Sequence, residues 1–130
     1  MNTKLLMTTS SIFMGLLGIT LSFMPNEIIN LLEQGSNKYS VLTLQLAGAL
    51  YFGFAVTNWM AKGILIGGIY ARPLAIGNFS HFLIAGLALS KFLANDSNPS
   101  TCFYILTIFY ALFAVAYGFI LFKHPQKENN

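Results

Sequence analysis

The chain has 130 residues, of which 55% are hydrophobic and only 8% are charged. A soluble domain carries roughly 25% charged residues, so these few ionised side chains are too few to cover a soluble fold of this size. The net charge is +3, and no basic patch of the kind that binds nucleic acid is present.

Four segments are long and apolar enough to cross a hydrocarbon layer, which takes about 20 residues. Only helices and closed barrels satisfy their backbone in lipid, and the alternation typical of barrel strands is absent. We therefore expect an all-α fold, a four-transmembrane-helix bundle that forms a single integral membrane domain over residues 1–130. The predicted spans are 5–23, 40–61, 74–93 and 101–122.

The first connection has a pattern of its own. Pro25 stands at a helix start and Gly35 at a helix stop, so residues 26–34 are predicted to form a short helix outside the membrane. Its apolar residues would lie against the membrane surface or the bundle. A simple connector without regular structure is the alternative.

The basic residues set the expected direction of the chain. Five of them fall on one side of the predicted spans and two on the other, and the side richer in Lys and Arg faces the cytoplasm. Both termini are thus predicted to be cytoplasmic, with 123–130 as a cytoplasmic tail. The first group is Lys4, Lys62, Arg72, Lys123 and Lys127, and the second is Lys38 and Lys91.

Small residues follow one stripe on several spans. Without a hydrophobic drive between helices in lipid, small residues let helix backbones approach and so favour association. The alternative is that glycine and serine are simply common in spans. The residues predicted to support helix packing are Ser11, Gly15, Gly18, Gly53, Ala85, Ala114 and Gly118.

Polar residues gather around the connection between the second and third spans. These spans run antiparallel across a short, glycine-rich connection and are expected to be neighbours. Polar groups at membrane depth are costly, so they are candidates for function by default. The predicted cluster, at the cytoplasmic end, consists of Asn58, Lys62, Tyr70, Arg72, Asn78 and His81.

Three interpretations of this cluster stay open. It is interhelical glue, or it binds an anionic or amphipathic ligand whose charge meets Lys62 and Arg72. In the third, His81 moves protons or ligates haem. A bis-histidine haem needs a second inward histidine, and the other one, His124, lies in the tail.

The sequence lacks the residues that most kinds of catalysis require. Cys102 is the single cysteine, and no carboxylate lies inside a predicted span. The two histidines have no Cys, Asp or Glu at metal-ligand spacing. We therefore expect no enzyme activity, no catalytic residue, no metal and no cofactor.

Three stretches come nearest to a signature: the run from Gly48 to Gly53, the pair Asn58 and Trp59, and the run from Gly68 to Pro73. With four spans, a polar first outer loop and a glycine-rich cytoplasmic hairpin, the chain resembles the small DoxX-like families of bacterial membrane proteins. The resemblance covers the whole chain in layout. It implies a fold and a place in the bacterial inner membrane more than a function.

Small multidrug-type exporters also have four spans, but they carry an essential Glu in the first one, and residues 5–23 contain none. This departure argues against proton-coupled cation export.

The expected partners are the lipid bilayer, a lipophilic ligand, and a second copy or another membrane protein, with no nucleic acid. The function expected is helix–helix interaction or binding of a lipophilic or amphipathic ligand at the cytoplasmic end. The alternative is a subunit of a small oligomeric transporter or channel.

Overall fold

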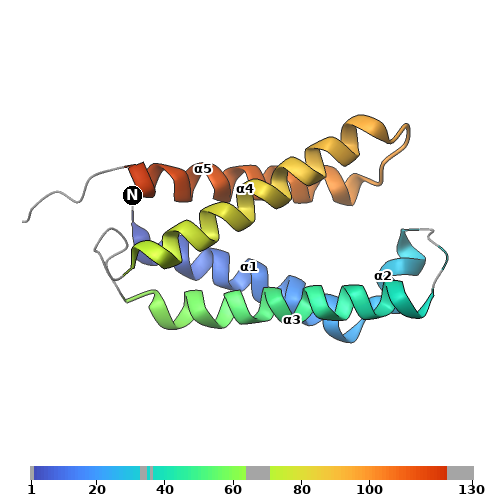
Figure 1. Cartoon of the computed structure of the whole chain (residues 1–130), viewed down its shortest axis with the longest axis horizontal. Coiled ribbons are helices and arrows are strands. Elements are labelled where there is room, and N and C mark those ends of the chain that lie inside the picture. Colours follow the sequence, from blue (N-terminus) through green and yellow to red (C-terminus); the bar gives the residue numbers. More distant parts are fainter. Residues whose placement is uncertain (1, 33–34, 36, 64–70, 123–130) are drawn as a thin grey trace, which may run out of the picture. The chain divides into compact units, whose positions relative to one another are not determined.

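The computed structural model describes residues 2–32, 35, 37–63 and 71–122, and all the regular structure within these residues is helical. Figure 1 shows the helices along the chain. The all-α prediction is therefore confirmed. The helices are α1 (Thr3–Phe23), α2 (Pro25–Leu31), α3 (Lys38–Ala61), α4 (Arg72–Asn95) and α5 (Thr101–Phe122).

Four of these helices, α1, α3, α4 and α5, are long and apolar enough to cross a membrane. Their ends lie within two residues of the predicted spans. The short helix α2 begins at Pro25 and ends at Leu31, whereas a helix over 26–34 was expected. Residues 33 and 34 of that prediction, like the tail 123–130, lie outside the described residues.

Local sequence explains where the helices begin. Asn37 caps α3, because its side-chain Oδ1 accepts hydrogen bonds from the backbone N–H groups of Tyr39 and Ser40, both at 2.9 Å. Asn2 caps α1 in the same way through the N–H of Leu5. The prolines of α2 and α4 stand in the first turn, where a missing N–H costs little.

Hydroxyl groups on exposed and half-buried positions turn back onto their own helices. Each donates to the backbone carbonyl four residues earlier, at 2.7–2.8 Å in the six clearest cases. Such bonds satisfy a hydroxyl without any outside partner. The six are Thr8, Thr20, Thr43, Thr57, Ser90 and Thr107.

The chain divides into two compact units. In the first, residues 2–63, α1 packs along α3 and the short α2 contacts both of them. In the second, α4 packs along α5. Each helix pair has its own packing, and the prediction of one domain over residues 1–130 stays a prediction.

Candidate functional site

Five of the six residues of the predicted polar cluster belong to the described part of the chain, and they are divided between the two units. Asn58 lies on α3 in the first unit, and Lys62 is the residue that caps the C-terminal end of this helix. Arg72, Asn78 and His81 lie on α4 in the second. Tyr70 lies outside the described residues. The site is therefore built below from each helix pair by itself.

Asn58 is the polar centre of the α1/α3 pair. It is fully buried, and its side-chain amide donates to the hydroxyl of Ser10 on α1 at 3.3 Å. The thioether of Met14, one turn along α1, lies 3.9 Å from the same amide nitrogen. Ser10 in turn donates to the carbonyl of Met7 at 3.2 Å. The amide is thus held by one face of α1.

A second polar contact lies beside the first. The hydroxyl of Ser11 donates to the backbone carbonyl of Ala55 at 2.6 Å, and both residues are buried. A helix carbonyl has a second lone pair, so it accepts this bond without losing its place in the helix. Ser11 and Ser10 therefore fix the antiparallel register of α1 on α3 from neighbouring positions.

Glycines bring the two backbones together further along the pair. A Cβ built on Gly18 would lie 2.7 Å from the backbone nitrogen of Phe52 and 3.0 Å from the carbonyl oxygen of Gly48. A Cβ on Gly48 would lie 2.7 Å from the nitrogen of Ser22 and 2.9 Å from the carbonyl oxygen of Gly18. Only glycine fits at either position, because the opposing atoms are backbone. Here α1 and α3 are in backbone contact.

Gly15 and Gly53, the other glycines predicted to support packing in this pair, differ in whether they lie at the helix contact. A Cβ on Gly15 would meet that of Ala55 at 3.6 Å, an ordinary van der Waals contact. Gly53 is exposed, and a Cβ there would meet nothing within 4 Å. The structure therefore places Ser11, Gly15 and Gly18 in the α1/α3 contact and Gly53 outside it.

Lys62 at the end of α3 lies against the single tryptophan of the chain. Its Nζ stands 3.0 Å from the centroid of the Trp59 ring. This cation–π contact holds the ammonium beside an indole that is itself half exposed, at 48%. Lys62 is therefore placed at the surface of the helix pair.

In the second unit, Asn78 and His81 lie one turn apart on α4. Asn78 is fully buried, and its amide donates to the carbonyl of Leu74 at 3.0 Å, within its own helix. The imidazole of His81 packs against the ring of Tyr110 on α5, with 5.8 Å between centroids. Arg72, in the first turn of α4, is exposed.

Phe82 is the centre of an aromatic cluster between α4 and α5. It is fully buried and stacks on Phe113 at 4.8 Å and on Tyr117 at 5.8 Å between ring centroids. The ring of Tyr110 meets it edge-on at 5.4 Å. Tyr110 and Tyr117 are also fully buried. His81 thus belongs to the edge of a packed aromatic core.

Small residues support this second contact as well. Gly118 is buried, and a Cβ there would lie 3.0 Å from the ring of Phe79. Ala114 is buried and Ala85 half-buried. The sequence analysis missed Gly86, whose added Cβ would meet that of Tyr110 at 3.5 Å.

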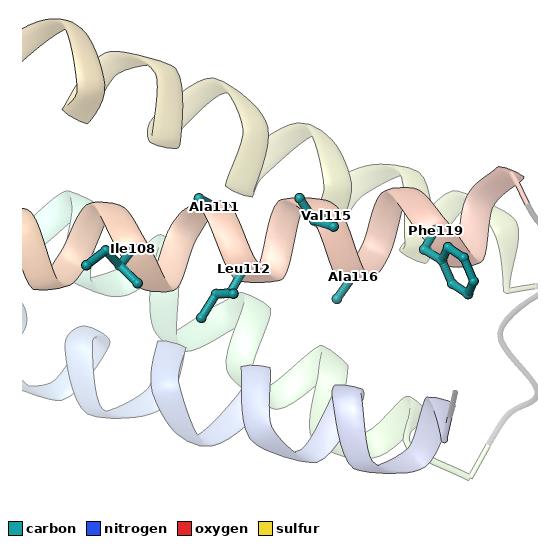
Figure 2. A pocket seen from close by; sticks show the side chains of 6 residues that line it. All are labelled: Ile108, Ala111, Leu112, Val115, Ala116 and Phe119. Atoms are coloured by element: carbon teal, nitrogen blue, oxygen red, sulfur yellow. The ribbon is translucent and has the colours of Figure 1, made fainter.

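One face of α5 forms an open apolar groove of about 510 Å³. Figure 2 shows the side chains that line it, all from this one helix. The lining residues are Ile108, Ala111, Leu112, Val115, Ala116 and Phe119. The sequence analysis did not single out this face, because α5 is apolar all round.

Within the described part of the chain, no three His, Cys, Asp or Glu side chains lie close enough to hold a metal ion. Comparison with models of known protein families finds no match, and neither do comparisons with curated proteins and with solved structures. The resemblance to the DoxX-like families therefore stays a prediction from layout. The functional argument rests on the two helix pairs themselves.

The Asn58 and Ser10 contact is expected to contribute modestly to the stability of the α1/α3 pair. Asn58→Leu and Ser10→Ala should each destabilise it, with a coupling free energy of about 0.5–1.5 kcal/mol in a double-mutant cycle. Unfolding of the four proteins in mixed micelles, followed by circular dichroism, measures this coupling. Additive effects of the two substitutions would contradict a direct bond.

Proposed function

We propose that this chain is a non-catalytic integral membrane protein of the bacterial inner membrane, and that it acts by helix–helix association within the bilayer. In this proposal the four long helices span the membrane as a bundle and both termini are cytoplasmic. The four apolar helices and the five-to-two division of basic residues support this arrangement. The hydroxyls that donate to carbonyls of their own helix support it too, because lipid offers them no other hydrogen-bond partner.

A non-catalytic role fits the use that the helix pairs make of their buried polar groups. Asn58, Ser10 and Ser11 bond to one another's helices, and Asn78 bonds to its own. The bonds between α1 and α3 favour the interpretation of Asn58 as interhelical glue, whereas the bond of Asn78 stays within α4. They leave Lys62 and Arg72 at the surface, where a ligand with negative charge is the second role open to them.

The observation that carries the proposal is an exposed apolar face of α5. Its apolar residues recur at alternating intervals of three and four, the spacing at which two helices interlock side by side. All of them are exposed, and the groove with its alanines lies along the same face. Such a face complements itself, so the partner proposed is a second copy of the chain. The row is Ile105, Ile108, Leu112, Val115, Phe119 and Phe122.

Native mass spectrometry of protein released from nanodiscs tests this association. The wild-type chain is expected to give dimers, and Ala111→Phe, which fills the groove, should weaken dimerisation by about tenfold. Ala88→Phe is the matched control, because Ala88 is an exposed alanine of α4 away from the groove. Monomers at every protein-to-lipid ratio, or an equal effect of the control, would contradict the proposal. A lipid retained by monomers and lost in Ala111→Phe would assign the groove to an acyl chain instead.

A second candidate, a subunit of a small oligomeric transporter or channel, has one observation in its favour. Asn78 and His81 place an amide and an imidazole one turn apart within a helix that is long and apolar enough to cross a membrane, and such groups often mark a path for polar solutes. Asn78→Cys and His81→Cys, made in a Cys102→Ser background, test it. The exposed Cys102 is removed because it would react first. Resistance of both cysteines to water-soluble thiol reagents from either side would exclude this candidate.

A further inference from the structure

The first helix pair carries two lysines at the same end. The contact of Ser10 with Asn58 fixes the register of antiparallel α1 and α3. Lys4 lies six residues before Ser10, and Lys62 lies four residues after Asn58. At 1.5 Å per helical residue, the two lysines extend about 9 Å and about 6 Å beyond that contact, in the same direction. They therefore stand within one helical turn of each other in height.

At this end of the pair, exposed apolar side chains lie next to the two lysines. Leu5 follows Lys4 and is exposed, and Met60 lies between Trp59 and Lys62 with 78% of its surface exposed. The Lys62 ammonium is held over the indole of Trp59 at 3.0 Å. A lysine beside a half-exposed tryptophan at the end of an apolar helix is typical of the boundary between hydrocarbon and headgroups.

The opposite end of the same helix pair has a different balance of acidic and basic side chains. Among the described residues of this unit the one acidic side chain is Glu27, on α2, which contacts α1 and α3 at their other ends. Lys38 lies there too, 5.1 Å from the ring of Tyr39. Within the described residues, the end with Lys4 and Lys62 thus has two positive charges and no acid.

We propose that Lys4, Lys62 and Trp59 form a binding site for the phosphate of an anionic phospholipid headgroup. The two ammonium groups attract the negative charge of the phosphate, and the Trp59 ring holds the ammonium of Lys62 in place. The exposed Leu5 and Met60 give the acyl chains a surface beside the charges, which a free phosphate ion would not use. This inference rests on the proposed membrane location and is independent of the α5 association.

The test uses the full chain in mild detergent with an equimolar mixture of phosphatidylglycerol and phosphatidylcholine. Native mass spectrometry reports the ratio of the two lipids retained. We expect wild-type protein to favour phosphatidylglycerol, and Lys62→Gln to lower that preference about fivefold, as expected for one basic residue near an anionic surface. Lys62→Arg should keep it, because a guanidinium also stacks on an indole.

Lys38→Gln is the matched control, since it removes the same charge from beside an aromatic ring on the same helix. It should leave the lipid ratio unchanged. An equal loss in Lys38→Gln would show that overall charge is responsible and would overturn the proposal. So would wild-type protein that retains both lipids equally.

Trp59 supplies a second readout, because it is the only tryptophan. Its emission should shift between nanodiscs of phosphatidylcholine and nanodiscs that contain phosphatidylglycerol, and this shift should be absent in Lys62→Gln. Inorganic phosphate added in detergent without lipid should leave the emission unchanged. If phosphate alone reproduced the shift, the site would bind a free anion and not a lipid. The same mass spectra count the copies per particle, so a failure of the α5 association is seen separately.

Discussion

Gly48→Ala should destabilise the α1/α3 pair by about 2 kcal/mol or more, although it adds a single methyl group. The new Cβ would lie 2.7 Å from the backbone nitrogen of Ser22 and 2.9 Å from the carbonyl oxygen of Gly18. Backbone atoms of a helix do not move aside as a flexible side chain does, so the two helices must separate. Unfolding in mixed micelles, followed by circular dichroism, measures the loss.

Gly53→Ala is the matched control for this prediction. It makes the same change five residues further along α3, where the added Cβ meets nothing within 4 Å. Because alanine favours a helix over glycine, this substitution should be neutral or stabilising by up to about 1 kcal/mol. Equal effects at the two positions would mean that α1 and α3 do not meet at Gly48.

Phe82→Ala should cause the largest loss in the α4/α5 pair. The ring is fully buried among Phe113, Tyr110 and Tyr117, so its removal leaves a cavity lined by three aromatic rings. In lipid the transfer of the ring costs little, since the surroundings are apolar in both states. The cavity term remains, and we expect a loss of about 1–3 kcal/mol.

The control for Phe82→Ala is Ile84→Ala on the same helix. Ile84 is 68% exposed, so its truncation removes surface that faces outward and leaves no cavity. Its effect should stay within about 0.5 kcal/mol. The apparent unfolding temperatures of both variants in detergent provide the comparison. A Phe82→Ala protein as stable as the control would contradict the aromatic core.

The positions of the long helices could be predicted from the sequence because length and composition determine them. Spans of about 20 apolar residues interrupted by residues such as Pro25, Asn37 and Pro73 leave few choices for where helices begin and end. The same apolar uniformity hides which faces meet. On α5 nearly every position is apolar, so periodicity does not separate buried Tyr110 and Tyr117 from exposed neighbours.

The contacts of the site required knowledge of helix register, which the sequence does not contain. Gly48 and Gly53 are both glycines of α3, yet only Gly48 meets α1. Asn58 was expected beside Asn78 and His81, but the bond that the structure describes goes to Ser10. Ser10 was not among the predicted packing residues, although its neighbour Ser11 was, and no sequence spacing distinguishes it as the partner of an amide 48 residues away.

The division into two helix pairs has a consequence for biosynthesis. All the contacts that join α1 to α3 are made by residues 2–63. In the proposed membrane location, this pair would be complete as soon as the ribosome has delivered α3 to the insertion machinery. The Asn58 amide is the polar side chain that α3 buries, and Ser10 of α1 is already in place to receive it. The first hairpin can therefore leave the translocation channel as a folded unit, while the ribosome is still translating the second.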